Sequence, residues 1–590
     1  MRSDFAKNLI ALLAFCYIKI VYATSKWQYL NKEIFDDYET VDIRTLLQGI
    51  PSRSALEIIA HCSAQIHTEE RDDSRQVALL QLWVGRLPTE VHARLNNFVS
   101  RMRAENVRFN FINNISNLLL CEYIIENHNS LTAVSNLTPE QELDLFKAYL
   151  WCSQQWTDEQ LSKEKLEITN EEQLARFLIC LQFPYQELLE FKDFRMQFIK
   201  ATFFFKFCEQ NPTFEEYLDI FCREHNVRSW REYLLHILSI YIRKFEELHT
   251  PSRLKVGDEH KAVQDFLRYF SIDPNNFKRS KDFLGLREKP VYEIEENDFL
   301  FLNLNLLVDK LFQGVQFALF KALQKNGATY KGKPIVKFDH FKSIYGEELS
   351  EKGLFYSIVK YAFEKNDYVK LDGQTLKAKL KDGEPDFYMR EKGKIYLIEY
   401  KDVIINASVK HSYDFDTIWA ELSKKFVSNE NNSAKGIKQL VNTIEGIYHD
   451  KFTMIDKFKK DEAIIYPILI FTDFVLNIAG VNYLLNREMR RLLNQRGIPD
   501  ANVKNLVLID LDELVKFQDL FRSKDLKLNN CLNEFIETVA KPPLDNRIST
   551  FTTFIHHKTK DFKDYTPKML FKEAEELLRD EPREDTTEHQ

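Results

Sequence analysis

The stretch from Lys381 to Asp402, KDGEPDFYMREKGKIYLIEYKD, places charged side chains in an otherwise apolar strand pattern. Side chains alternate along a β-strand, so Glu399 and Lys401 point to the same face. The residues REKGK are typical of a hairpin turn, which would bring Asp386 beside Glu399 on the neighbouring strand. Two carboxylates and a lysine would then meet at one edge of a sheet, where oxygen ligands suit Mg²⁺ or Mn²⁺.

The strand that carries these charges is expected to be covered on both of its faces. Tyr396, Ile398 and Tyr400 lie on one face, and Ile395 and Leu397 continue the face of Glu399. A charge held away from water is destabilising unless it is paired or bound to metal, so the pattern indicates a functional site. The alternative is a surface ion pair near a strand end, which would leave one face of the strand open to water.

Helical and strand-like segments alternate around this hairpin. A helical pattern at 350–365, SEKGLFYSIVKYAFEK, precedes the strand-like segments DYVKLDG, EPDFYMR and KIYLIEYKD. After a loop come a helical segment, AKGIKQLVNTIEGIYHD, and a further strand, AIIYPILIFTD. This alternation predicts an α/β domain with a mixed central sheet flanked by helices.

Pro385-Asp386 followed by Glu399-Tyr400-Lys401 resembles the signature of the PD-(D/E)xK nuclease superfamily. The resemblance covers residues of about 330–480, with flanking elements from about 285 to 570. The family core runs helix, three strands, helix, strand, and carries its signature on the second and third strands, as expected here. The resemblance implies a restriction-endonuclease-like fold. A second Pro-Asp pair, Pro499-Asp500, has no ExK sequence after it.

The same resemblance implies roles for individual residues. Asp386, Glu399 and the backbone carbonyl of Tyr400 would bind Mg²⁺ or Mn²⁺, and Lys401 would orient the attacking water or stabilise the phosphorane. Burial would lower the pKa of Lys401 while the two carboxylates would raise it, and the sequence leaves this balance open.

Two helices of such a fold could add further groups. The first helix often supplies a glutamate to the metal site; here the candidate is Glu351 and its rival is Glu348. Either one could equally be a solvated acid that the helix dipole favours. In the second helix, Gln439 would be the catalytic member of a polar face, while Lys435 and Lys438 could meet phosphates. The alternative is that this face is simply solvated.

The whole chain is too long for a single core, so it is expected to be multidomain. Residues 1–250 predict an all-α accessory or recognition region, because apolar residues recur at helical spacing between widely spaced prolines. Residues 251–289 are polar and turn-rich, typical of a linker or boundary, and precede the nuclease-like α/β domain at 290–570. Residues 571–590 are acidic and are expected to be disordered.

Composition limits the partners and the compartment. The net charge is −8, so nucleic-acid binding would need a local basic face. Eight scattered cysteines without a CxxC pair favour reduced, buried thiols and a cytoplasmic protein. The apolar stretch within residues 1–26 is expected to be a buried helix, with a signal peptide as the minority alternative; it is short for a membrane span.

The expected function is a metal-dependent endonuclease that hydrolyses phosphodiester bonds, of DNA rather than RNA, with a bacterial restriction or phage-defence role by analogy. Two alternatives stay open: a non-catalytic helical interaction protein with a nuclease-like nucleic-acid-binding module, and a transposon-end or junction-cutting nuclease. The helical region could also mediate a homodimer or bind a partner protein. The sequence contains no phosphate-binding P-loop, zinc-protease motif or serine nucleophile elbow.

Overall fold

A computed structural model of the chain describes most of its length. The described residues are 34–35, 42–66, 79, 83, 85–104, 111–134, 136–161, 168, 170–189, 192–246, 252–380, 384–452, 454–542, 544–562 and 565–579. The expected N-terminal helix or signal peptide at 1–26 lies outside them. In the part of the chain that the structure describes, no helix is both long and apolar enough to cross a membrane.

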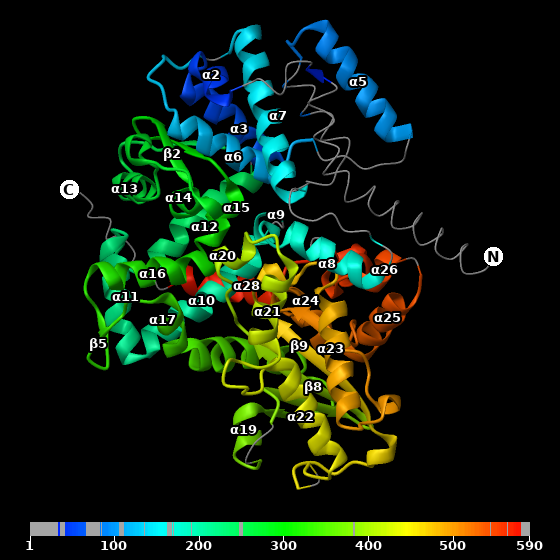
Figure 1. Cartoon of the computed structure of the whole chain (residues 1–590). Coiled ribbons are helices and arrows are strands. Elements are labelled where there is room, and N and C mark those ends of the chain that lie inside the picture. Colours follow the sequence, from blue (N-terminus) through cyan, green and yellow to red (C-terminus); the bar gives the residue numbers. More distant parts are fainter. Residues whose placement is uncertain are drawn as a thin grey trace, which may run out of the picture.

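The first half of the described chain is helical, as its sequence predicts (Figure 1). Helices start where the sequence indicates. α11 begins at Pro212, and the side chain of Asn211 accepts a hydrogen bond from the Thr213 N–H. The helices are α2 (Ile43–Gln48), α3 (Ser52–Ile66), α5 (Thr89–Ala104), α6 (Asn114–Glu126), α7 (Pro139–Leu161), α8 (Glu171–Gln182), α9 (Gln186–Leu189), α10 (Phe194–Gln210), α11 (Pro212–Glu224) and α12 (Trp230–Glu246).

A three-stranded sheet follows, and it ties the polar segment after residue 250 to later residues. β1 (Arg253–Lys255) pairs antiparallel with β3 (Asp298–Phe301), which pairs antiparallel with β2 (Val291–Glu295). The connecting segment holds α13 (Lys261–Tyr269) and α14 (Leu284–Glu288), and α15 (Leu304–Asp309) and α16 (Gln313–Lys325) come after β3. The expected linker therefore contains regular structure.

A five-stranded mixed sheet forms the centre of the second half. Its strand order is β10-β9-β8-β7-β6, with β6, β7 and β8 antiparallel and β8, β9 and β10 parallel. The strands are β6 (Val369–Asp372), β7 (Phe387–Glu391), β8 (Lys394–Lys401), β9 (Ile464–Phe471) and β10 (Val507–Asp510). Helices cover both faces. The prediction of a helical region followed by an α/β region with a mixed sheet is therefore confirmed.

Alternation along β8 sends its side chains into two different hydrophobic clusters. Tyr396, Ile398 and Tyr400 join one cluster, while Ile395 and Leu397 join the other. The first cluster includes α10, α18 (Tyr356–Ala362) and α24 (Leu511–Ser523). The second includes α8, α21 (Phe415–Phe426), α22 (Gly436–Tyr448) and α23 (Val481–Gln495). The strand is covered on both faces, as the sequence predicts.

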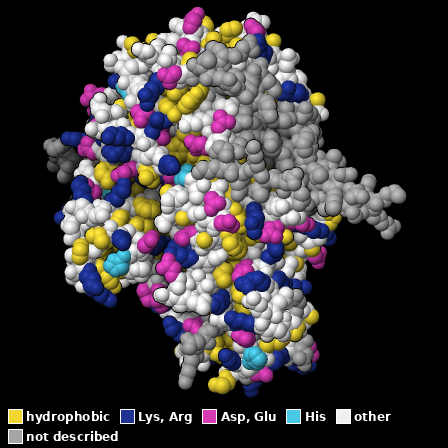
Figure 2. Space-filling model, viewed as in Figure 1, with side chains coloured by type: hydrophobic (Ala, Val, Ile, Leu, Met, Phe, Trp, Pro, Cys, Tyr) yellow, Lys and Arg dark blue, Asp and Glu magenta, His cyan; other side chains and the backbone are white. Residues whose placement is uncertain are grey.

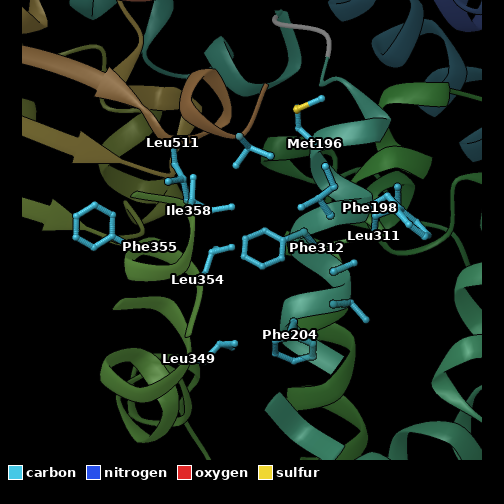
Figure 3. Packing of buried hydrophobic residues seen from close by; sticks show 14 of the residues in the cluster. Met196, Phe198, Phe204, Leu311, Phe312, Leu349, Leu354, Phe355, Ile358 and Leu511 are labelled. Atoms are coloured by element: carbon cyan, nitrogen blue, oxygen red, sulfur yellow. The ribbon is translucent and has the colours of Figure 1, made fainter. Parts of the chain in front are cut away.

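Helices from the first half thus help to cover the sheet of the second half. α10 and α8 contribute Phe204 and Leu178, both fully buried, to the clusters on opposite faces of the sheet. Figure 3 shows apolar side chains meeting between α10 and the helix that carries Leu354 and Ile358. Because each cluster combines residues from before and after the 251–289 segment, the division into domains at this segment stays a prediction.

Three segments are more regular than the sequence suggests. The expected loop after β8 contains α20 (Ala407–Lys410) and α21, whose buried Phe415, Ile418, Leu422 and Phe426 follow helical spacing. α19 (Gly373–Lys377) lies between β6 and β7. Residues 571–579 belong to α28 (Lys568–Arg579) and are not disordered, because Leu577 is buried and Lys206 pairs with Glu573 and Glu576; residues 580–590 lie outside the described part.

The cysteines within the described residues behave as their scatter predicts. Seven are described, and all seven are buried and have no disulfide partner among the described residues. Burial raises the pKa of the Cys62 thiol to about 12, which keeps this group protonated and unreactive at neutral pH.

Replacing Phe355 with alanine tests whether this packing positions the first helix of the α/β region. Phe355 is fully buried and stacks on Tyr400 with ring centroids 4.6 Å apart. We expect Phe355→Ala to lower the free energy of unfolding by ~3–5 kcal/mol, because it leaves a cavity against the sheet. Urea unfolding followed by tyrosine fluorescence measures the change. Phe571→Ala is the matched control, since Phe571 is 64% exposed and should change stability by less than about 0.5 kcal/mol. Equal effects of the two substitutions would contradict the packing.

Candidate active site

The β7–β8 hairpin brings Asp386, Glu399 and Lys401 together. Phe387 pairs with Ile398, so Asp386, one residue before β7, lies level with Glu399. The Nζ atom of Lys401 lies 3.0 Å from Oε2 of Glu399 and 3.7 Å from Oδ2 of Asp386. The predicted convergence of two carboxylates and a lysine is therefore seen in the structure.

Backbone contacts fix the position of Asp386. The N–H of Tyr400 donates to Oδ2 of Asp386 at 2.8 Å, and the N–H of Gly373 donates to its carbonyl oxygen at 2.8 Å. A side chain at position 373 would come within 2.8 Å of the Tyr356 hydroxyl and 3.2 Å of that carbonyl, so glycine allows the close approach. The peptide group of Tyr400 thus lies at the site; its carbonyl as a metal ligand stays a prediction.

Glu399 is the most deeply buried of the three side chains. Its side chain is 0% exposed, and Oε1 has no hydrogen-bond partner among the described residues. Burial raises the pKa of the Glu399 carboxyl well above its usual range, and the charge of Asp386 adds to this effect. The Oε1 atom of Glu399 is therefore available to a ligand at the site.

The charge state of Lys401, open at the level of sequence, follows from the geometry. Burial acts against the ammonium, but the charges of Glu399 and Asp386 outweigh burial and raise the pKa of Lys401. Lys401 therefore stays protonated at neutral pH. It can donate hydrogen bonds at the site but cannot accept a proton there.

The structure distinguishes between the two candidate glutamates of the first helix. Glu351 borders the same cavity as Asp386 and accepts a hydrogen bond from the Tyr356 hydroxyl. Burial and the charge of Asp386 raise the pKa of Glu351 to about 6. Glu348 is 58% exposed and pairs with Lys352. Glu351 is therefore the glutamate placed to join the site.

Glu351 lies in a π-helical segment, η3 (Gly346–Phe355), which continues α17 (Phe338–Tyr345) into α18. π-Helical turns are rare and occur often at functional sites. The sequence pattern predicts an ordinary helix here, although the buried Leu349 and Leu354 are five residues apart, a spacing that fits a π turn. The wider turn places Leu349 and Leu354 in the core while Glu351 borders the cavity.

The start of α22 forms the opposite wall. Gly436 has φ +29°, and a side chain there would come within 3.1 Å of the carbonyl oxygen of Phe426 and 3.3 Å of Leu469, so glycine lets the start of α22 pack closely; Cε of Lys401 lies next, at 3.4 Å. Gln439 borders the cavity with an Oε1 atom that has no partner among the described residues. Lys435, at the N-cap, and Lys438, which donates to Asn432, are half-buried but do not border the cavity.

These walls enclose a cavity of about 570 Å³. Charged side chains dominate its lining: the carboxylates of Asp339, Glu347, Glu351, Glu384, Asp386 and Asp402, and the ammonium groups of Lys342, Lys352, Lys377 and Lys425. Figure 2 shows that, on the visible face, basic and acidic side chains are interspersed and do not form one basic patch. Sequence reasoning missed Lys342 and Asp402, although Asp402 directly follows the ExK residues.

The carboxylate oxygens at the site are chemically suited to bind a hard divalent cation. Carboxylate oxygens of Asp386, Glu399 and Glu351 are the ligands that Mg²⁺ and Mn²⁺ prefer, and Oε1 of Glu399 awaits a partner. Within the described residues, however, no group of three or more His, Cys, Asp or Glu side chains is arranged to hold a metal ion. The ammonium of Lys401 lies near both Asp386 and Glu399 and balances their charge in this arrangement.

Comparison with known proteins does not assign the chain to a family. No family model, no curated protein and no solved structure matches the chain. The resemblance to a nuclease superfamily therefore depends on the residues themselves and on the order of the elements around them.

Metal binding at this site should depend on pH. Glu351, with a pKa of about 6, and Glu399, whose pKa burial raises well above its usual range, both bind protons that a cation would displace. We expect Mg²⁺ binding to tighten as the pH rises through about 6 and to release protons. Isothermal titration calorimetry in two buffers of different ionisation enthalpy measures the number released. Glu351→Gln should reduce that number and Glu348→Gln should not. Binding without proton release would contradict the site.

Proposed function

We propose that this protein is a metal-dependent endonuclease that hydrolyses phosphodiester bonds, with DNA as the preferred substrate, on a restriction-endonuclease-like fold. One observation carries the proposal: Glu399 is fully buried with an unpartnered oxygen, close to Lys401 and next to Asp386, which borders a polar cavity. A structural ion pair would gain nothing from such an arrangement, because an unpartnered buried oxygen is destabilising.

The order of elements supports the fold part of the proposal. The helix formed by η3 and α18 precedes β6, β7 and β8, and α22 and β9 come later. This is the order helix, three strands, helix, strand that the resemblance implies, with α19, α20 and α21 as additions. The signature residues lie next to β7 and at the end of β8, as that order requires.

Each side chain has a definite task in this proposal. Asp386, Glu399 and Glu351 would hold Mg²⁺ or Mn²⁺, which when bound lowers the pKa of a coordinated water and neutralises charge at phosphorus. Lys401, which stays protonated, donates hydrogen bonds to the attacking water or to a phosphate oxygen. Gln439 can orient either group through its amide. Lys435 and Lys438 remain candidate phosphate contacts beyond the cavity.

The choice among related functions and the biological role come from the set of residues at the site and from analogy. The intact set of Asp386, Glu399 and Lys401 argues against a non-catalytic binding module, which would not need to keep it. A transposon-end or junction-cutting enzyme would use the same site, so its geometry does not separate these uses. A restriction or phage-defence role, with the helical region recognising DNA or pairing with a second copy or another protein, extends the proposal by analogy.

Cleavage assays test this function directly. Purified protein is incubated with plasmid DNA, linear DNA and RNA in Mg²⁺ or Mn²⁺, beside Asp386→Asn, Glu399→Gln and Lys401→Met. We expect wild type to cut DNA and each variant to lose at least about 100-fold in rate, as removal of one charge-stabilising group does elsewhere. Gln439→Ala should lose less, because its amide only orients.

Two controls sharpen this comparison. Asp500→Asn changes the second Pro-Asp pair and should leave the rate unchanged. Glu348→Gln should also leave the rate unchanged, whereas Glu351→Gln should lower it. The proposal is wrong if wild type cuts none of the three substrates in either metal. It is also wrong if the site variants cut as fast as wild type.

A further inference from the structure

Asp402 and Lys342 form a second group of charged side chains that borders the same cavity. They lie at the end of β8, on the sheet face opposite Lys401. The carboxylate of Asp402 accepts three hydrogen bonds, each of 2.7 Å: from Nζ of Lys342, from Oγ of Ser350 and from Oγ1 of Thr472. Burial acts against its charge, but Lys342 and the two hydroxyls hold the pKa of Asp402 below its usual value. The carboxylate thus joins α17, η3 and the end of β9.

Lys342 is more buried than the other lysines around the cavity. Its side chain is 14% exposed, less than those of Lys352 and Lys425, while Lys377 is exposed. An ammonium has three N–H donors, and within the described residues only Asp402 accepts from Lys342. Its remaining donors therefore border a polar cavity without a protein acceptor.

The alternation of side chains along β8 determines how Lys342 lies relative to Lys401. Asp402 is the next residue after Lys401, and neighbouring side chains on extended chain point to opposite faces. Lys401 lies with Glu399 on the α22 side, and Lys342 and Asp402 lie with Tyr400 and Ser350 on the η3 side. The two ammonium groups thus flank the end of one strand: Lys342 borders the cavity, and Lys401 lies behind Asp386, which also borders it.

We propose that Lys342 binds the backbone phosphate next to the scissile one, and that Asp402, with Ser350 and Thr472, positions it. This inference rests on the proposed function, since it names the substrate contacts of that same site. Six carboxylates border the cavity against four lysines, so a polyanion needs a firmly placed cation there. A side chain already held in place loses little conformational entropy when it binds.

Binding of nucleic acid, measured apart from cleavage, tests the inference. The probe is a fluorescein-labelled oligonucleotide, single-stranded or duplex, in Ca²⁺, and fluorescence anisotropy is recorded over a salt series. We expect Lys342→Met to weaken binding roughly 10- to 100-fold. The slope of log K against log salt should fall by about 0.9 for duplex or about 0.7 for single strand. Lys342→Arg should retain most of the binding.

Lys360→Met is the matched control. Lys360 lies further along the same continuous helix and also pairs with a single aspartate, Asp372, but it does not border the cavity. It should bind within about twofold of wild type with an unchanged salt slope. Competition with inorganic phosphate separates the sources of the ligand: a backbone phosphate contact predicts weak competition, whereas strong competition at equal concentration would identify a free-phosphate site and overturn the inference.

A double variant separates loss of the phosphate contact from instability caused by an unpaired Asp402. Lys342→Met leaves Asp402 without its cation, so the double variant Lys342→Met/Asp402→Asn removes both charges and should show the same reduced salt slope. The inference is overturned if either variant keeps the wild-type affinity and slope, or if wild type does not bind the oligonucleotide. Failure of the endonuclease proposal looks different: binding depends on Lys342 but no cleavage occurs in Mg²⁺ or Mn²⁺.

Discussion

The ammonium of Lys401 holds two carboxylates together inside a sheet that is covered on both faces. Without that cation, the carboxyls of Glu399, which is fully buried, and Asp386, which borders the cavity, could not both be charged. With it, one buried oxygen of Glu399 still lacks a partner. The arrangement is therefore stable enough to form yet electrostatically incomplete, which is the condition that a divalent cation and a phosphate would satisfy.

Packing on both sides of the sheet makes this arrangement possible. Phe355 stacks on Tyr400 and fixes η3, so that Glu351 faces Asp386 across the cavity. On the other side Gly436 lets the start of α22 pack closely against the Phe426 carbonyl and Leu469, and Gln439 of the same helix borders the same space. Because α8 and α10 complete the two hydrophobic clusters, the helical first half contributes directly to the surroundings of the site. A change in those helices could thus reach the site through packing alone.

The chemistry of the hairpin was predictable from sequence, since strand alternation and a short turn determine which side chains share a face. Asp386, Glu399 and Lys401 meet for that reason, and the buried face of α22 follows from apolar spacing at Leu440 and Ile444. Other features had a weak local signal or none. The π turn that orients Glu351 shows only in the five-residue spacing of Leu349 and Leu354, and the role of Asp402 depends on Lys342 and Thr472, 60 and 70 residues away. The charge state of Lys401 likewise depends on distances that no pattern supplies.

The helices that the sequence left as loop or tail were missed for a related reason. α28 is stabilised by packing and by pairs such as Lys206 with Glu573, which join residues far apart in the chain. α21 differs, because its buried Phe415, Ile418 and Leu422 follow helical spacing and were visible in the sequence. Short polar segments are assigned poorly from propensity alone, because tertiary contacts decide their structure.

The most direct test of the central claim is to locate the cation. Crystals grown or soaked in Mn²⁺ and measured near the manganese absorption edge show where the ion binds, independently of any activity. We predict one anomalous peak with oxygen atoms of Asp386 and Glu399 at about 2 Å, and with Lys401 moved away from Glu399. A peak elsewhere, or none while Lys401 still bridges the two carboxylates, would contradict the account.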